Sequence, residues 1–484
     1  MTKEMKMKRR VWMSMAFVIA LTSGIRAQET PSEVLPITLE KAIEIGLSEN
    51  PTILIADQEI QRMEYVKKEA AGNLYPTISG TGSFTHNIQK QKMFMGGGFD
   101  IAGMMGSTLK DLFANVPEQY WPDWNNLGGG SSEDSNSPME VGLRNSVNGG
   151  FSLTLPLFMP TIYKNLKLSE KQILNAVESA RQNKITLANQ IKKSYYGILL
   201  AESSLDVLKR NIEYAQVIVN DTRNQFQQGI VSEYDLITAE VQLSNLQPTL
   251  IQTENSIKIA RLTLNMLLSL PLDTRLALQE ELYDFKNFIN SEFRGKIDLA
   301  DNSDLKLLDI QGELLQTQLE LQRASRMPSL VGMANYTVMS QSEDLKINHY
   351  QWLGSSSVGL QLNIPIFAGF TNKHKEKQTK INLDQLKLQR DYQEQAINLE
   401  AQTALNNIEQ ACKQMVANEA TKQQAEKGYR ISKTRFDVGA GTMVELNSAQ
   451  MALLQADLNY SQSIYDYMSA QADYDKLVGK ERNN

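Results

Sequence analysis

The stretch Phe226-Gln-Gln-Gly229-Ile-Val-Ser-Glu-Tyr-Asp235-Leu236 has a counterpart near the other end of the chain, Phe436-Asp-Val-Gly439-Ala-Gly-Thr-Met-Val-Glu445-Leu446. In each copy a Phe lies three residues before a Gly, and an acidic residue follows six after it, with a Leu next. Both copies interrupt long, mostly polar helical patterns. Gly readily adopts the left-handed conformation that ends a helix. Each copy therefore predicts a tight turn between two long helices.

Heptad repeats flank these turns. After Pro160 a helical pattern continues for about 65 residues, and beyond the first turn it resumes at Leu236. Before the turn, the apolar residues that recur every seven positions are Ile191, Ile198, Leu205, Ile212, Val219 and Phe226. A seam of this kind is typical of coiled coils. At ~1.5 Å per residue, the first helix would be on the order of 100 Å long.

Between the helical segments, alternating apolar and small or polar residues predict four strands. They lie at about 76–87, 147–158, 328–340 and 355–367. In the second, Phe151, Leu153 and Leu155 alternate with Ser152 and Thr154. Each strand is therefore expected to have one apolar face and one small or polar face.

The two halves of the chain repeat one plan. Leu305, Asp309 and Met327-Pro328-Ser329 match Ile53, Asp57 and Tyr75-Pro76-Thr77 at one constant offset. This self-similarity indicates an internal duplication. We expect a first structural repeat at 28–268, a less regular linker at 269–301 and a second repeat at 302–484.

The N-terminal residues 1–27 have the pattern of a secretory signal peptide. Five basic residues precede an apolar run from Val11 to Leu21, and the small residue Ala27 offers a cut site. The run is too short to span a bilayer comfortably. The chain has one cysteine, Cys412, so no internal disulfide is possible.

Charge and motifs exclude several classes of protein. The net charge is −6, and removing the segment through Arg26, with six basic residues and one acidic, leaves −11. That balance argues against nucleic-acid binding, which needs a basic face. No phosphate loop, metal-ligand spacing or nucleophile–base arrangement stands out, and His86, His349 and His374 are isolated. We expect no enzyme activity and no cofactor.

A long irregular stretch at 88–146 is rich in Gly, Met and aromatic residues. Loops of this length are usually functional or mobile. Its methionines suggest a soft-metal site. A flexible apolar loop is favoured instead, because no His or Cys of the stretch supports metal binding.

In an exported protein, strands with one apolar face are typical of a membrane β-barrel. Four strands cannot close a barrel, and open sheet edges are not tolerated in lipid, so several chains must share one barrel. The alternative, a small soluble sandwich, leaves helices of this length unexplained.

Several of these motifs resemble those of TolC-like outer membrane efflux proteins. They are Ile37-Thr-Leu-Glu-Lys-Ala-Ile with Asn50-Pro51, Tyr75-Pro76, Leu155-Pro156-Leu157-Phe158 and both Gly turns. The resemblance covers essentially the whole mature chain. It implies an α+β membrane protein, a homotrimer whose shared twelve-stranded outer-membrane barrel, four strands per chain, continues into a long α-helical coiled-coil barrel in the periplasm.

The resemblance also implies a function. The protein would be the outer-membrane exit duct of a tripartite efflux or type I secretion system, working with a periplasmic adaptor protein and an inner-membrane pump. An exported trimeric coiled-coil scaffold or adhesin is the alternative. A protein of that class would also have heptad repeats, but it would not need strands with alternating apolar residues or a pair of glycine turns. Small-molecule efflux is favoured over protein or metal export, and the cargo stays open.

In that arrangement the two turns form the periplasmic end of each subunit. The residues expected at the adaptor-binding tip are Phe226, Gly229, Phe436, Gly439 and Gly441. Asp235 and Glu445 match the family's acidic positions near the entrance. Glu445 is expected to line the constriction, and Asp235 is expected to help hold neighbouring helices closed. Lys433 and Arg435 are candidate partners of these acidic residues. The alternative that all four are solvated turn charges stays open. Gly441 and Ser448 depart from the family's basic and acidic residues.

Overall fold

The computed structural model describes residues 34–93, 116–117, 139–141, 143–288, 297–346 and 350–480. They divide into two compact units. The first comprises the described parts of Met1–Lys67, Lys167–Leu319 and Lys377–Asn484, and the second those of Lys68–Leu166 and Glu320–Glu376. The expected signal peptide 1–27, most of the Met-rich stretch and part of the linker 269–301 lie outside the described residues.

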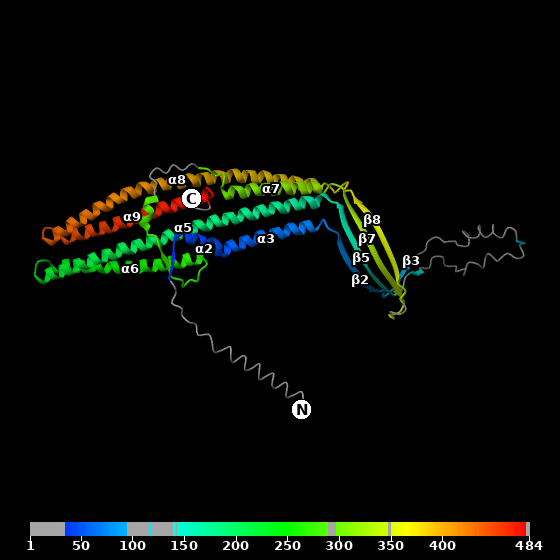
Figure 1. Ribbon diagram of the computed structural model, residues 1–484, viewed down its shortest axis with the longest axis horizontal. Coiled ribbons are helices and arrows are strands. Elements are labelled where there is room, and N and C mark those ends of the chain that lie inside the picture. The colour runs from blue at the N-terminus through cyan, green and yellow to red at the C-terminus, as the bar shows by residue number, and fades with distance from the viewer. Residues whose placement is uncertain are drawn as a thin grey trace, which may run out of the picture. The chain divides into compact units, whose positions relative to one another are not determined.

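Four long helices form two hairpins of matching build (Figure 1). Helix α5, Pro160–Gln227, has 68 residues and is followed by α6, Glu233–Leu267, with 35. Helix α8, Thr371–Asp437, has 67 residues and is followed by α9, Met443–Leu477, with 35. This agreement confirms the two long hairpins. Helix α6 continues through Pro248.

Among the described residues there are also three shorter α-helices: α2, Leu39–Glu49; α3, Pro51–Gly72; and α7, Ser303–Ala324. Thr38 caps α2, because the threonine side chain accepts a hydrogen bond from the backbone N–H of Lys41. Within the described part of the chain, no helix is both long enough and apolar enough to cross a membrane.

The core of the first unit is a narrow seam between helices. Ile191 and Ile198 of α5, Leu264 of α6 and Tyr467 of α9 are almost fully buried and belong to one cluster. Two smaller clusters continue the contact between the hairpins, one with Leu208 and one with Leu446. The opposite faces of these helices carry charged and amide side chains. The stability of this unit therefore depends on apolar contacts spread along the helices.

A small mixed element packs against this seam. Strand β1, Leu35–Ile37, pairs in parallel with β6, Leu276–Leu278, and the 3-10 helix η2 covers Leu282–Phe288. Ile37, Leu276 and Leu282 are buried in the main cluster. The sequence did not predict these strands, because three residues are too few to show a period.

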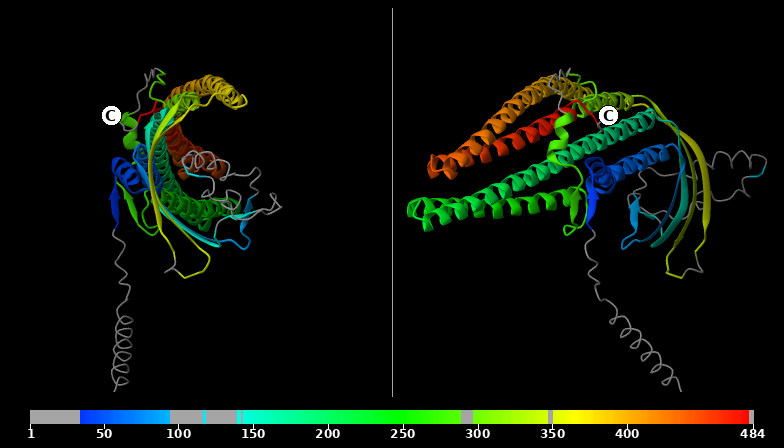
Figure 2. Two further views of the ribbon diagram at one scale, coloured as in Figure 1. Left: turned by 90° about the vertical axis from the view of Figure 1, so that its right-hand side faces the viewer. Right: turned by 60° about the vertical axis from the view of Figure 1, so that its left-hand side comes forward.

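The second unit contains an antiparallel sheet in the order β2-β5-β7-β8, with strongly bent strands (Figure 2). The strands are β2, Thr77–His86; β5, Asn145–Phe158; β7, Ser329–Ser342; and β8, Leu353–Asn363. Each strand pairs with the next strand of the sheet along most of its length: β2 with β5, β5 with β7, and β7 with β8.

Two details of the strand prediction were wrong. Strand β8 ends at Asn363, whereas the apolar alternation predicted a strand to about 367. Pro365 has no N–H to donate to a ladder, so pairing stops before it. The stretch 88–146 also contains a short antiparallel pair, β3 at Gln91–Met93 with β4 at Met139–Val141, where no strand was expected.

One face of the sheet exposes large apolar side chains. Val358 is 88% exposed, Leu360 71%, Ile78 68% and Phe151 65%. The outer strands β2 and β8 each pair along one side only, among the described residues. An exposed apolar face with unpaired edges needs cover from lipid or from other chains.

A buried ion pair offers a test of the first unit's packing. Lys192 Nζ lies 3.6 Å from an Asp475 carboxylate oxygen, and both side chains are mostly buried. Burial lowers the pKa of Lys192, and the nearby Asp475 carboxylate opposes that shift. Asp475 also lies 3.5 Å from Lys480. The carboxylate thus compensates two ammonium groups.

We predict that Asp475→Ala lowers the free energy of unfolding by about 3–5 kcal/mol, because a buried ammonium loses its compensating carboxylate. The measurement is the thermal unfolding midpoint of the detergent-solubilised protein. Lys192→Met is the matched control and should have a much smaller effect, because methionine removes the buried charge, keeps an unbranched apolar stem of similar length and leaves Asp475 paired with Lys480. Equal losses for the two variants would contradict this account.

Candidate functional site

The two turns have the same backbone geometry. Gly229 and Gly439 both have φ of 74°, in the left-handed region. The N–H of Ile230 bonds to the carbonyl of Gln225, and the N–H of Ala440 to that of Arg435, at 2.9 and 2.8 Å. This pattern is the helix-ending arrangement that Gly favours. The prediction of two left-handed glycine turns is confirmed.

The helices that follow the turns begin in the same way. Ser232 caps α6 and Thr442 caps α9 by accepting from backbone N–H groups three residues later, each at 3.2 Å. Those N–H groups belong to Asp235 and Glu445. Both acids therefore lie in the first turn of a helix, where a negative charge is favoured by the helix dipole.

The two acids differ in their side-chain partners. The Asp235 carboxylate accepts from the backbone N–H of Ser232 at 3.1 Å and from its hydroxyl at 2.7 Å, which completes a capping box. The Glu445 carboxylate instead lies 3.7 Å from the Arg435 guanidinium. Arg435 also donates to the carbonyl of Ala440 at 3.1 Å. Within one chain, Asp235 stabilises its own helix, whereas Glu445 is held across the turn.

The two basic residues also have different partners. Lys433 lies 3.5 Å from Asp221 of α5 and 3.4 Å from Asp437. Of the four predicted charged residues, the structure therefore brings Arg435 and Glu445 together, and it places Lys433 beside other carboxylates. Arg435 and Glu445 are each about half exposed. Exposed pairs contribute little stability, so this pair is available for exchange with other partners.

The two Phe residues are inequivalent. Phe436 is 6% exposed and packs in a cluster with Met443 and Leu446, whereas Phe226 is 39% exposed. Gly441 lies against the end of α8, where an added Cβ would stand 3.1 Å from the backbone nitrogen of Phe436. The second turn is therefore the more tightly packed of the two.

Two contacts between the hairpins were not anticipated from the sequence. The Gln450 amide of α9 is fully buried and donates to the carbonyl and side-chain oxygens of Asn211 in α5, at 3.1 and 2.9 Å. The rings of Tyr214 and Tyr429 stack with centroids 5.4 Å apart. Burial of the Tyr429 hydroxyl raises its pKa most, and the nearby Tyr214 and Asp437 raise it further, to about 12. Gln450 lies off the heptad line of Leu446, Leu453 and Tyr460, so the sequence carries no clear signal for the first contact.

The 3-10 helix η2 forms a strap against the second hairpin, α8 and α9. Lys422 of α8 lies over the rings of Tyr283 and Tyr460, 5.5 and 5.4 Å from their centroids. Tyr283 also bonds to Ser461 of α9, and Lys286 pairs with Glu419 of α8. The side-chain contacts of η2 thus reach both α8 and α9.

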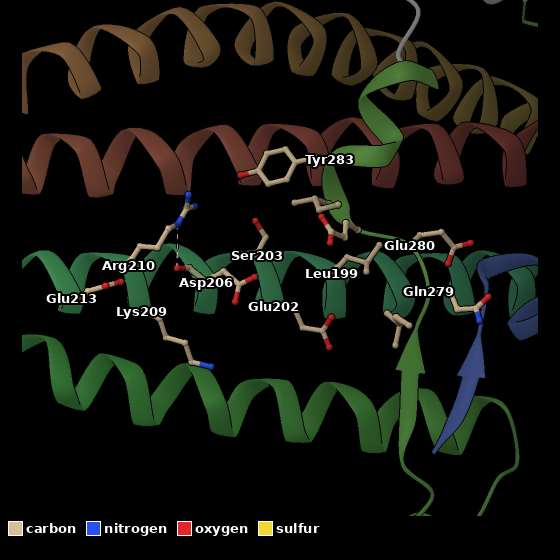
Figure 3. A pocket seen from close by; sticks show the side chains of 13 residues that line it. Leu199, Glu202, Ser203, Asp206, Lys209, Arg210, Glu213, Gln279, Glu280 and Tyr283 are labelled. Carbon is tan, nitrogen blue, oxygen red and sulfur yellow. Dashed lines mark hydrogen bonds between the residues drawn. The ribbon is translucent and has the colours of Figure 1, made fainter. Parts of the chain in front are cut away.

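Beside this strap lies a groove of about 680 Å³ between α5 and the segment from Leu278 to Tyr283 (Figure 3). Its lining mixes acidic and basic side chains, and one of them, Glu202, pairs with Arg261 of α6. Among the described residues, no group of three or more His, Cys, Asp and Glu side chains could hold a metal ion. We assign no ligand to this groove.

Comparisons with known proteins agree on one family. A family model described as "Outer membrane efflux protein" matches residues 123–269 and 298–480. TolC of Vibrio cholerae serotype O1 is 19% identical over 336 residues, which cover 69% of this chain and 76% of that protein. The alkaline protease secretion protein AprF of Pseudomonas aeruginosa is 24% identical over 327 residues, covering 66% and 67%.

Solved structures share the fold. The outer-membrane channel OprN aligns with a TM-score of 0.67 at 13% identity, covering 91% of this chain and 89% of that one. The Campylobacter jejuni channel CmeC aligns with a TM-score of 0.65 at 17% identity, covering 91% and 85%. The chain has the TolC-like fold of these channels.

The two family matches cover more than half of the chain, one in each half. The chain therefore belongs to the outer membrane efflux protein family. It is an outer-membrane channel, the exit duct of efflux or type I secretion systems, and a transport protein rather than an enzyme. Family membership favours this duct over a coiled-coil scaffold or adhesin.

We predict that Asp235→Ala speeds hydrogen exchange of the amides around the first turn, because the Ser232 backbone N–H and hydroxyl lose the carboxylate that accepts their hydrogen bonds in the capping box. Glu445→Ala should change exchange at the second turn less, since the Glu445 carboxylate lies near the exposed Arg435 guanidinium and does not complete a capping box as Asp235 does. Thr442→Ala is the matched control there and should speed exchange. A larger effect for Glu445→Ala than for Asp235→Ala would contradict these assignments.

Proposed function

We propose that three copies of this chain form the duct. They share a twelve-stranded barrel in outer-membrane lipid, and their long helices form a tunnel in the periplasm. The observation that carries this proposal is the sheet, whose apolar face is exposed and whose two outer strands each have an edge that no described strand pairs with. Two more copies would pair both edges, and lipid would cover the apolar face.

The same proposal gives the expected domains a role. Residues 1–27 direct export, and the repeats 28–268 and 302–484 each supply two strands and one helical hairpin. The segment 269–301 contributes to an equatorial region, which is supported by the packing of η2 against α8 and α9.

Native mass spectrometry of the full-length protein in detergent tests the assembly. We predict three chains per particle. Tyr336 lies on the apolar face, opposite Ser356 in the ladder, and Tyr336→Asp should reduce membrane insertion, because a charged side chain on the lipid face destabilises a barrel. Thr337→Asp, one residue away on the polar face, is the control and should insert normally. A monomer that resides outside the outer membrane would contradict the proposal.

The turns are proposed as the adaptor-binding end, with energy supplied by an inner-membrane pump. Phe226, Gly229, Phe436, Gly439 and Gly441 form this tip. The exposed apolar residues Ile230 and Val438 support a docking role, since they are 64% and 72% exposed. Small-molecule efflux is the favoured task.

The charged residues of the tip are proposed to form the entrance gate. Three Glu445 carboxylates brought close together repel one another and attract cations. The Arg435 contact at 3.7 Å partly neutralises that charge. Lys433, beside Asp221 and Asp437, holds α8 against α5. Asp235 braces the first turn through its capping box.

Single-channel recording in planar bilayers tests the gate. We predict that Glu445→Gln lowers cation selectivity, because the carboxylates that concentrate cations are gone, and that Arg435→Ala raises it. The control is Glu254→Gln, which neutralises an exposed carboxylate of α6 away from the turn. Unchanged selectivity and conductance in Glu445→Gln would refute the constriction role.

A further inference from the structure

The four strands of the sheet carry no formal charge. Strands β2, β5, β7 and β8 contain no Asp, Glu, Lys or Arg. The long helices are rich in all four. Absence of charge is expected on the apolar face, which lipid would cover. It is not required on the other face, where water solvates charged groups readily.

The ladder pairing shows what that other face presents. Ser79 stands opposite Ser152, Ser83 opposite Asn148, and Thr337 opposite Ser355. Hydroxyl groups on this face bond to one another, Ser79 with Ser152 at 2.6 Å and Thr337 with Ser355 at 2.7 Å. Further members of the face are Thr77, Thr81, Thr85, Ser146, Thr154, Asn335 and Ser357. The polar face is thus formed largely of hydroxyls and amides, together with uncharged apolar side chains of Val331, Met333, Met339 and Leu353.

This polar face is also the hollowed one. A depression of about 350 Å³ is lined by residues of all four strands, including Thr81, Ser83, Asn148, Thr337 and Ser355. The hydroxyls offer hydrogen bonds to a passing solute in either role, because each can donate or accept. They attract neither cations nor anions by net charge.

We propose that the sheet supplies the outer part of the duct with a charge-free wall, so that this part passes cationic, anionic and neutral polar solutes alike and charge selection resides at the helical entrance. The inference rests on the proposed trimeric duct. A wall without fixed charge leaves the local concentrations of small cations and anions nearly equal, whereas rings of charged side chains enrich one sign. The substrate class that fits is therefore polar solutes of mixed charge, selected before they reach the sheet.

Cysteine accessibility in the full-length protein tests this wall. In a Cys412→Ala background, Ser355→Cys places a thiol on the polar face, and its neighbour Ser356→Cys places one on the apolar face. Ser448→Cys places a third thiol at an exposed position one helical turn beyond Glu445. Each variant, in outer-membrane vesicles, is treated with a cationic and an anionic methanethiosulfonate of similar size, and modification rates are compared with those of a small free thiol.

We expect Ser355→Cys to react with both reagents at a rate ratio within about twofold of the free thiol, and Ser448→Cys to favour the cationic reagent severalfold. Ser356→Cys should be protected from both. Thr337→Cys serves as a second probe of the polar face, and total thiol after denaturation confirms that each variant is present.

The outcomes separate the two proposals. A strong preference of Ser355→Cys and Thr337→Cys for one sign of reagent, with Ser356→Cys protected, overturns the charge-free wall and leaves the duct intact. Ready modification of Ser356→Cys with protection of Ser355→Cys overturns the duct, because the apolar face would then meet water. Protection of both faces also overturns the wall.

Discussion

The rest of the structure depends on the narrow apolar seam between the long helices. The long helices bury stripes of mostly apolar residues, such as Ile191 and Ile198, and leave their outer faces to charged and amide side chains. Such a seam stabilises a helix only in proportion to its length, and helices of 67 and 68 residues supply that length. Because this seam is narrow, little apolar surface is buried elsewhere in the first unit. Polar contacts therefore set the register, as the buried Gln450 amide does against Asn211.

The sheet of the second unit differs from this seam, because its apolar side chains are exposed rather than buried. Its apolar face is exposed, and the polar face opposite it carries hydroxyls and amides without charge. A surface like this is unfavourable in water and favourable in lipid. In a membrane channel of the outer membrane efflux protein family, lipid can surround the apolar face of such a sheet. The exposed side chains of β8 are thus a consequence of function rather than a packing defect.

The two duplicated turns have the same backbone geometry but different side-chain contacts. The glycine conformation, the carbonyl contacts and the helix caps are the same in both copies. The side chains then take different tasks. Asp235 completes a capping box and Glu445 faces Arg435, while Phe436 is buried and Phe226 is half exposed. A backbone geometry that depends only on Gly allows the neighbouring side chains to change freely.

The sequence by itself determined the elements that have a period or a special backbone requirement. Heptads predicted the hairpins, alternation predicted the four strands, and Gly229 and Gly439 predicted the turns, because each signal is local to the chain. The tertiary structure alone decided the contacts between distant segments. It paired β1 with β6, placed Lys422 over Tyr283 and Tyr460, and separated the roles of Asp235 and Glu445. No period marks such contacts, since they depend on which side chains meet once the helices have packed.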